Sequence, residues 1–168
     1  MIALLPFVLN AHPGKTCCQK MGPAKDSSSL EMPIVKTQRT FAMIKPDAVA
    51  KKDAGEIISM IEKNGFTIAR LQMRTLTPKE AEIFYAEHKG KPFFADLVEY
   101  ITSGPVIALM LEKENAVADW RELIGTTDPT QARPGTIRKM FAESKSKNAV
   151  HGSDSIESAE RELKLFFN

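Results

Sequence analysis

Cysteine is almost missing from this chain of 168 residues: the only two, Cys17 and Cys18, are neighbours near the N-terminus. Adjacent cysteines cannot join distant segments, so a disulfide framework is excluded. The chain from Met32 onward contains none, which fits a reducing compartment. Because no apolar run approaches the roughly 20 residues that cross a bilayer, we expect a cytoplasmic protein without a membrane partner.

An excess of charge is also lacking, since 23 Lys and Arg stand against 21 Asp and Glu, for a formal net charge of +2. Dedicated nucleic-acid binders normally carry a basic excess. RNA-binding sheets also present aromatic side chains on central strands, whereas the apolar run at residues 106–111 is aliphatic. Nucleic acid is therefore not an expected partner.

Residues 1–38 lack the hydrophobic periodicity of the rest of the chain. We interpret them as an N-terminal extension: a disordered tail, or sequence upstream of a natural start at Met32. Because acidic residues are scarce here, an organelle leader is the alternative, with import through residues 1–38. The "PGKT" at residues 13–16 is not a P-loop, because Leu9 stands where that motif requires glycine. His12 with the two cysteines lacks a fourth ligand for zinc.

From Arg39 onward, strand and helix patterns alternate. Residues 66–76 read as a strand with one phase slip, and Thr77, Pro78 and Glu80 form a helix start with a capping box. The predicted strands cover residues 39–44, 66–76, 104–112 and 148–151. The predicted helices cover residues 54–65, 76–88, 92–104, 113–125 and 155–167. This order predicts an α+β, ferredoxin-like split βαβ sandwich: a four-stranded antiparallel sheet with helices packed on one face.

The segment "NAVHGSDS" at residues 148–155 places His151 just before the last predicted helix. Asp154 and Glu157 have the spacing of a capping box, and helix N-termini attract phosphate. A carboxylate of this helix, at Glu160 or Glu162, would hold one imidazole nitrogen and leave the other as a nucleophile. The alternative is that His151 is an ordinary residue at a strand end.

Other residues have the properties that phosphate chemistry requires. Lys45 ends the first strand, Arg121 lies in a helix, and Arg138 follows a polar loop that contains the hydroxyl of Thr127. Any of these cations taken alone is also typical of a solvated surface. One ring of the pair Phe93 and Phe94 is expected in the core, and the other is expected to be exposed for stacking on a base.

Several separate segments resemble the nucleoside diphosphate kinase family. "NAVHGSDS" is similar to its active-site signature, Asn-x-x-His-Gly-Ser-Asp. The resemblance continues, in the same order along residues 39–167, through "RTFAMIKPDAV", "GEII", "FYAEHKGKPFF", "LVEYITSGPV", "NAV", "DPTQARPGTIR" and "ESAERE". It implies that residues 39–168 form a nucleoside diphosphate kinase catalytic domain.

The resemblance also implies a role for each matching residue. His151 would be the phosphohistidine nucleophile, oriented by Glu162 and Ser153, and Tyr85 would line the catalytic pocket. Asp154 would contact, through water, a Mg²⁺ ion that the nucleotide phosphates hold. The remaining roles are nucleotide contacts: the base on Phe93 and Leu97, the ribose and γ-phosphate on Lys45 and Asn148, and the phosphates on Arg121, Thr127 and Arg138.

Two departures accompany the match. Lys145 stands where relatives often have an apolar residue beside the base, and the chain ends at Asn168 without the C-terminal extension of eukaryotic members. Residues 126–140 resemble the intersubunit loop of the family, which implies a homo-oligomer, either a tetramer or a hexamer.

The predicted function is therefore transfer of the γ-phosphate of a nucleoside triphosphate, such as ATP, to a nucleoside diphosphate, by a ping-pong mechanism through His151. The alternative is a catalytically weak relative that acts as a nucleotide-binding regulatory module. The complete set of His151, Lys45, Arg121, Arg138 and Asn148 argues against that alternative.

Overall fold

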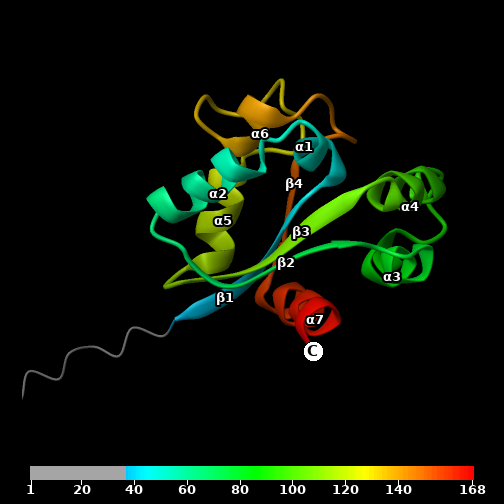
Figure 1. Ribbon diagram of the computed structural model, residues 1–168, viewed down its shortest axis with the longest axis horizontal. Helices are drawn as coiled ribbons and strands as arrows, with labels where there is room; N and C mark the ends of the chain where they lie inside the picture. Colours follow the sequence, from blue (N-terminus) through cyan, green and yellow to red (C-terminus); the bar gives the residue numbers. More distant parts are fainter. Residues whose placement is uncertain (1–36) are drawn as a thin grey trace, which may run out of the picture. The chain divides into compact units, whose positions relative to one another are not determined.

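The structure is a computed structural model that describes residues 37–168 (Figure 1). Residues 1–36 of the N-terminal extension, and with them the interpretations of residues 13–16 and of the cluster around His12, lie outside the described residues, whereas Gln38 already belongs to the first strand. The strands are β1 (Gln38–Ile44), β2 (Thr67–Thr75), β3 (Pro105–Lys113) and β4 (Val150–Gly152). The helices are α1 (Pro46–Ala50), α2 (Ala54–Lys63), α3 (Pro78–Phe84), the short 3₁₀ helix η1 (Ala86–His88), α4 (Phe94–Thr102), α5 (Ala116–Ile124), α6 (Ile137–Phe141) and α7 (Ile156–Phe167).

The four strands form one sheet in the order β2-β3-β1-β4, and every neighbouring pair is antiparallel. The first and last strands are therefore adjacent, and Met43 of β1 pairs with His151 of β4. This topology confirms the predicted ferredoxin-like α+β fold. It also brings the end of β1 and the histidine segment together, although about a hundred residues separate them in sequence.

The prediction of helices on one face is wrong, because helices cover both faces (Figure 1). Helices α2 and α5 pack on one face, and α3, α4 and α7 pack on the other. The reason lies in β1, where Phe41 and Met43 point to one core cluster and Ala42 and Ile44 to the other. A strand with apolar residues at both parities has to be covered on both sides.

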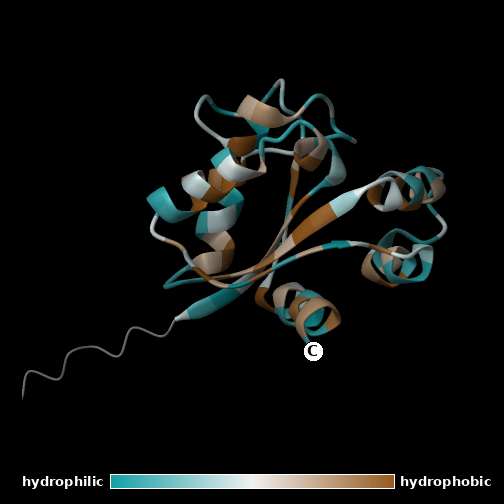
Figure 2. Cartoon of the chain, viewed as in Figure 1, coloured by the Kyte–Doolittle hydropathy of each residue, from teal (hydrophilic) through white to brown (hydrophobic). Residues whose placement is uncertain are grey.

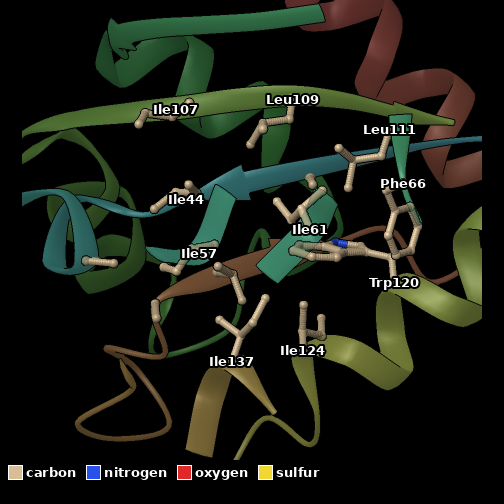
Figure 3. Close-up of a cluster of buried hydrophobic side chains, with 14 of the residues drawn as sticks. Ile44, Ile57, Ile61, Phe66, Ile107, Leu109, Leu111, Trp120, Ile124 and Ile137 are labelled. Carbon is tan, nitrogen blue, oxygen red and sulfur yellow. The ribbon is translucent and has the colours of Figure 1, made fainter. Parts of the chain in front are cut away.

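The core on the α2 and α5 face is built around Trp120, whose indole is fully buried (Figure 3). Phe66 meets this ring edge-on, with 6.1 Å between ring centroids. Aliphatic side chains from β3, including Leu109 and Leu111, lie over it. The hydrophobic stretch of β3 is visible between the helices of the two faces in Figure 2. This packing fixes α5 against β1 and β4, which positions the residues that follow.

Several local predictions are confirmed. The phase slip in β2 is a register shift between Ile68 and Arg70. Thr77 and Glu80 form the predicted capping box of α3. Helix α5 ends at Gly125, whose φ of 80° suits glycine. Within residues 37–168, no helix combines the length and apolar character that crossing a bilayer requires.

Three other local features differ from the prediction. The capping box of α7 is made by Ser155 and Ser158, not by Asp154 and Glu157, because Ser155 is the residue with extended backbone whose hydroxyl accepts from the Ser158 N–H. The short helices α1 and α6 were not predicted, since five residues are too few to show a hydrophobic period.

Candidate active site

A cavity of about 450 Å³ opens beside β4 and receives side chains from both halves of the chain. His151 contributes from β4, and Glu162 from the second turn of α7. The other predicted residues that line it are Lys45, Tyr85, Phe93, Leu97, Arg121, Thr127, Arg138, Asn148 and Asp154. Ser153 is buried behind the cavity wall, where it contacts Glu162. The fold thus gathers all twelve predicted site residues in one place.

One nitrogen of the His151 imidazole is paired with a carboxylate. Its Nε2 lies 3.1 Å from Oε2 of Glu162, and the Ser153 hydroxyl donates to the same oxygen at 2.7 Å. The His151 side chain is 22% exposed, whereas that of Glu162 is 7% exposed. Because the carboxylate occupies Nε2 as an acceptor, the second ring nitrogen, Nδ1, keeps its lone pair for chemistry.

Packing and a backbone contact also restrain this histidine. The ring of Phe84 meets the imidazole edge-on at 5.0 Å between centroids, and Phe41 lies at 6.0 Å. Trp120 donates its indole N–H to the carbonyl of His151 at 3.2 Å. Glycine is required at the next position, since a Cβ on Gly152 would lie 2.5 Å from that indole nitrogen. The candidate nucleophile is therefore restrained by Phe41 and Phe84 from one face of the sheet and by Trp120 from the other.

Lys45 enters the cavity from the end of β1 and is almost fully buried. Its Nζ donates to Oδ1 of Asn148 at 2.7 Å. Burial, and then the charge of Arg138, lower the pKa of Lys45 to about 8, with Asp47 opposing that change. A buried ammonium with a lowered pKa next to another cation gains strongly from an incoming anion.

Arg138 comes from α6, the helix inside the long polar segment. It donates to the carbonyls of Gly125 at 2.9 Å and Val150 at 3.1 Å. Its Nε is buried and has no hydrogen-bond partner within the described part of the chain. Burial, and then the charge of Arg121, lower the pKa of Arg138 to about 10. Together with Lys45 and Arg121, it makes one wall of the cavity cationic.

Tyr85 and Asp154 complete the polar lining. The Tyr85 hydroxyl is buried without a hydrogen-bond partner among residues 37–168. Burial and then the charge of Glu162 raise the pKa of Tyr85, which keeps the hydroxyl protonated as a donor. A hydrogen bond with Ser158 lowers the pKa of Asp154, and the charge of Arg121 adds to this effect, so the carboxylate is ionised.

Phe93 lines the cavity and offers a ring for stacking, which is called the aromatic platform below. Phe93 is about half exposed, whereas Phe94 packs on the core, as the sequence predicted for this pair. His88 lies between Tyr85 and Phe93 and contacts both rings. Lys145 lines the same cavity and pairs with Asp128 at 3.1 Å. A flat ligand stacked on Phe93 would thus share the cavity with the cationic side chain of Lys145.

Comparisons with known proteins agree with this geometry. The family model described as "Nucleoside diphosphate kinase" matches residues 38–168. The chain belongs to the nucleoside diphosphate kinase family. A relative of that name from a Nitratiruptor species is 56% identical over 130 residues, which cover 77% of this chain and 95% of the relative. Another, from Chlamydia abortus, is 53% identical over 131 residues, 78% of this chain and 93% of its own length.

Solved structures of the nucleoside diphosphate kinase family resemble the fold as well. A crystal form of the Aquifex aeolicus enzyme has a TM-score of 0.77 at 44% identity, covering 79% of this chain and 96% of that one. The apo enzyme from Encephalitozoon cuniculi has a TM-score of 0.76 at 39% identity, covering 77% and 88%. The family resemblance noted in the sequence is thus confirmed.

Sequence reasoning assigned no role to Asp47 and Tyr100, although both belong to segments that it singled out. Tyr100 lines the cavity and donates its hydroxyl to Asp47 at 2.6 Å. The only sequence signal was the position of Asp47, two residues after Lys45 in "IKPD". A contact with a tyrosine 53 residues away leaves no local pattern.

Proposed function

We propose that this chain transfers the γ-phosphate of a nucleoside triphosphate to a nucleoside diphosphate through a phosphohistidine at His151. The observation that carries the proposal is the arrangement around the imidazole. Its Nε2 is held by Glu162, and the ring lies in a cavity whose lining includes Lys45, Arg121 and Arg138. Membership of the nucleoside diphosphate kinase family supports the same reaction.

The reaction takes place in two half-reactions at one site. The lone pair of Nδ1 attacks the γ-phosphorus, the bond to the β–γ bridging oxygen breaks, and the nucleoside diphosphate leaves with that electron pair. A second diphosphate then attacks the phosphohistidine with its terminal oxygen, and Nδ1 recovers its lone pair. Glu162 stabilises the positive charge that the ring acquires while Nδ1 carries the phosphoryl group.

The cations stabilise charge that spreads over the transferring oxygens. In this proposal Arg121, Thr127 and Arg138 hold the phosphates and Lys45 contacts the γ-phosphate, which is supported by their common position in the cavity lining. The Tyr85 hydroxyl is a donor in the same pocket. Asn148, already bonded to Lys45, offers its amide to the ribose hydroxyls. Since these contacts address phosphate and sugar, they do not distinguish one nucleotide from another.

The base lies on Phe93 with Leu97 beside it in this proposal. Stacking on a ring needs only a π-face, which every base has. The platform therefore favours a broad range of nucleotides. Lys145 lines the same cavity, and Lys91 lies 5.8 Å from the centroid of the Phe93 ring, so cationic side chains accompany the proposed base site.

Magnesium enters with the nucleotide in this proposal. Within residues 37–168 no group of three or more His, Cys, Asp or Glu side chains has the arrangement of a metal site. Asp154 is a carboxylate in the cavity lining. A Mg²⁺ ion held mainly by phosphate oxygens would contact it through water. When bound, the ion neutralises phosphate charge.

We also propose that the chain acts as a homo-oligomer, either a tetramer or a hexamer, in which residues 126–140 lie between subunits. This segment contributes Thr127 and Arg138 to the cavity. If a second subunit contacts this segment, assembly would also fix the positions of Thr127 and Arg138 in the cavity.

The test of the transfer function is the His151→Ala variant. We expect it to lose more than about a thousandfold in transfer rate, because a methyl group supplies no nucleophile, while nucleotide binding remains. The wild type incubated with γ-labelled ATP should become labelled on Nδ1 of His151, in an acid-labile and alkali-stable form. A wild type that binds nucleotide without ever becoming labelled would favour the regulatory module instead.

A further inference from the structure

Asp47 makes two tertiary contacts with one carboxylate. It lies in the first turn of α1, where an acidic side chain commonly does no more than complement a helix N-terminus. Here, however, Oδ1 accepts from the Tyr100 hydroxyl at 2.6 Å, and Oδ2 accepts from the backbone N–H of Ala149 at 3.0 Å. The partners are 53 and 102 residues away in sequence. The carboxylate thus joins α1, α4 and the segment that enters β4.

The backbone of Ala149 needs such a contact. Its φ is +65°, a left-handed conformation that residues with a Cβ adopt reluctantly. Apart from Lys52, it is the one non-glycine residue among residues 37–168 with a positive φ. Both of its peptide groups are used: the N–H by Asp47, and the C=O by the backbone N–H of Lys45 at 2.8 Å. An uncommon conformation persists where surrounding contacts determine it in this way.

The position of this residue makes the conformation matter for chemistry. Ala149 stands between Asn148, whose side chain holds the Lys45 ammonium, and His151, two residues later on β4. If Ala149 moved to a right-handed or extended conformation, the direction of the chain would change between these two groups. Asp47 itself is absent from the cavity lining, so it acts through its neighbours rather than on a ligand.

Charge adds to this arrangement. The ammonium of Lys45 faces Arg138 from α6, Asp47 from α1, the ring of Tyr100 from α4 at 5.9 Å, and Asn148. Among these neighbours Asp47 is the anion, and it opposes the effect of burial and of Arg138 on the lysine.

We infer that Asp47 is a positioning residue for the proposed phosphoryl transfer: by holding Ala149 in its left-handed conformation, its carboxylate aligns Asn148 and Lys45 with His151. The inference rests on the proposed function. It predicts that loss of the carboxylate reduces kcat rather than nucleotide affinity, because the groups remain but are misaligned.

The test begins with Asp47→Asn, which keeps the shape but leaves a single acceptor oxygen for two donors. We expect kcat to fall by about tenfold to a hundredfold, with KM changed by less than about threefold, as is typical of displaced reacting groups. Asp53→Asn is the matched control, since this nearby aspartate makes no side-chain cap hydrogen bond and lies outside the cavity. Its kcat should equal that of the wild type.

A second substitution separates positioning from simple loss of charge. Glycine adopts a positive φ without a steric penalty, so Ala149→Gly in the Asp47→Asn background should recover kcat by about threefold or more. Tyr100→Phe, which removes the other contact and keeps the ring, should lower kcat by about twofold to fivefold. If Asp47→Asn does not fold cooperatively, Tyr100→Phe tests the positioning role of Asp47 in its place.

The outcomes are distinct. Wild-type kcat in Asp47→Asn, or in Tyr100→Phe where that variant has to decide, overturns the inference. A loss in Asp47→Asn that Ala149→Gly does not relieve overturns it as well. If the wild type itself forms no phosphohistidine, the proposed function fails, and the result does not concern Asp47.

Discussion

At the scale of single residues, the site depends on groups whose ordinary properties are changed by burial. The Tyr85 hydroxyl is kept protonated by its surroundings, and the Arg138 Nε is buried without a partner within residues 37–168. Lys45 is a third such group, a buried cation with a lowered pKa whose ammonium donates to the neutral amide of Asn148. Such residues cost stability in the free protein and become useful when an anion arrives.

Lys45 should therefore give the reaction an alkaline limit. Its pKa in the folded protein is about 8, so kcat/KM should fall as the pH rises through that value, because the phosphate then meets a neutral amine. Lys45→Met should lower kcat/KM and remove this limb. Lys63→Met, which removes an exposed lysine at the end of α2, is the control and should keep the profile. A kcat/KM of the wild type that stays constant from pH 7 to about 10 would contradict the assignment.

Raising the pH should lower activity through Lys45 but raise the free energy of unfolding through the same residue. Because the folded pKa of Lys45 lies below its ordinary value of 10.5, the unfolded chain binds more protons between about pH 8 and pH 10.5. The contribution of Lys45 to the free energy of unfolding should thus be most unfavourable below pH 8 and rise across that range. Urea denaturation of the wild type and of Lys45→Met at several pH values would separate this contribution from other titrations.

At the scale of elements, β4 is a strand of only three residues that depends on its neighbours. Hydrogen bonds to β1 hold one edge of the strand, and α5 packs against it through Trp120 and Ile124. Gly152 is what allows this approach. The consequence is that the position of His151 is determined by the packing between β4 and α5 as well as by Glu162.

Gly152→Ala should accordingly damage both stability and activity. The added Cβ would lie 2.5 Å from Nε1 and 2.6 Å from Cδ1 of Trp120, a fully buried ring. We expect a loss of about 1–3 kcal/mol in the free energy of unfolding, as for other overpacked cores. The hydrogen bond from Trp120 to the His151 carbonyl should weaken, and the transfer rate should fall.

Gly55→Ala is the matched control for this substitution. Gly55 lies inside α2, and a Cβ there would meet nothing within 4 Å among residues 37–168. Because alanine favours the helix over glycine, this variant should be unchanged or more stable by up to about 1 kcal/mol. Equal stability of both alanine variants in urea denaturation would show that the close approach to Trp120 does not constrain β4.

At the scale of the whole molecule, one edge of the sheet is left uncovered by residues 37–168. β2 is one of the two outer strands, the other being β4, and most side chains of β2 are exposed. Leu71 and Met73 are 49% and 56% exposed, and they lie opposite Leu109 and Ile107 of β3, on the face that α2 and α5 cover elsewhere. An exposed edge with apolar side chains is a site where another strand can pair.

We therefore expect β2 to contribute to the proposed assembly. Replacing Leu71 and Met73 together by lysine should shift the particle toward the monomer, because two charges oppose burial of this edge. Ile83→Lys is the control, since Ile83 is equally exposed but lies on α3. Light scattering on dilution measures the outcome. A wild type that is monomeric at every concentration and fully active would refute the assembly itself.

The sequence by itself determined the elements and the chemical groups. The phase slip in β2, the capping box at Thr77 and the glycine end of α5 are local, and local patterns record them. The proposed nucleophile, His151, was also identifiable, because its segment resembles a signature of the family to which the chain belongs. Each of these features depends on residues a few positions apart, which are neighbours in the structure because they belong to the same helix, strand or turn.

Only the tertiary structure decided how these parts meet. It placed helices on both faces of the sheet, set Ser155 rather than Asp154 as the cap of α7, and gave Nε2 rather than Nδ1 to Glu162. It also joined Asp47 to Tyr100 and to Ala149. The physical reason is that hydrogen bonds and close packing act over about 3–4 Å in space, whatever the separation in sequence. A carboxylate at residue 47 and a peptide group at residue 149 become neighbours only after the sheet has formed.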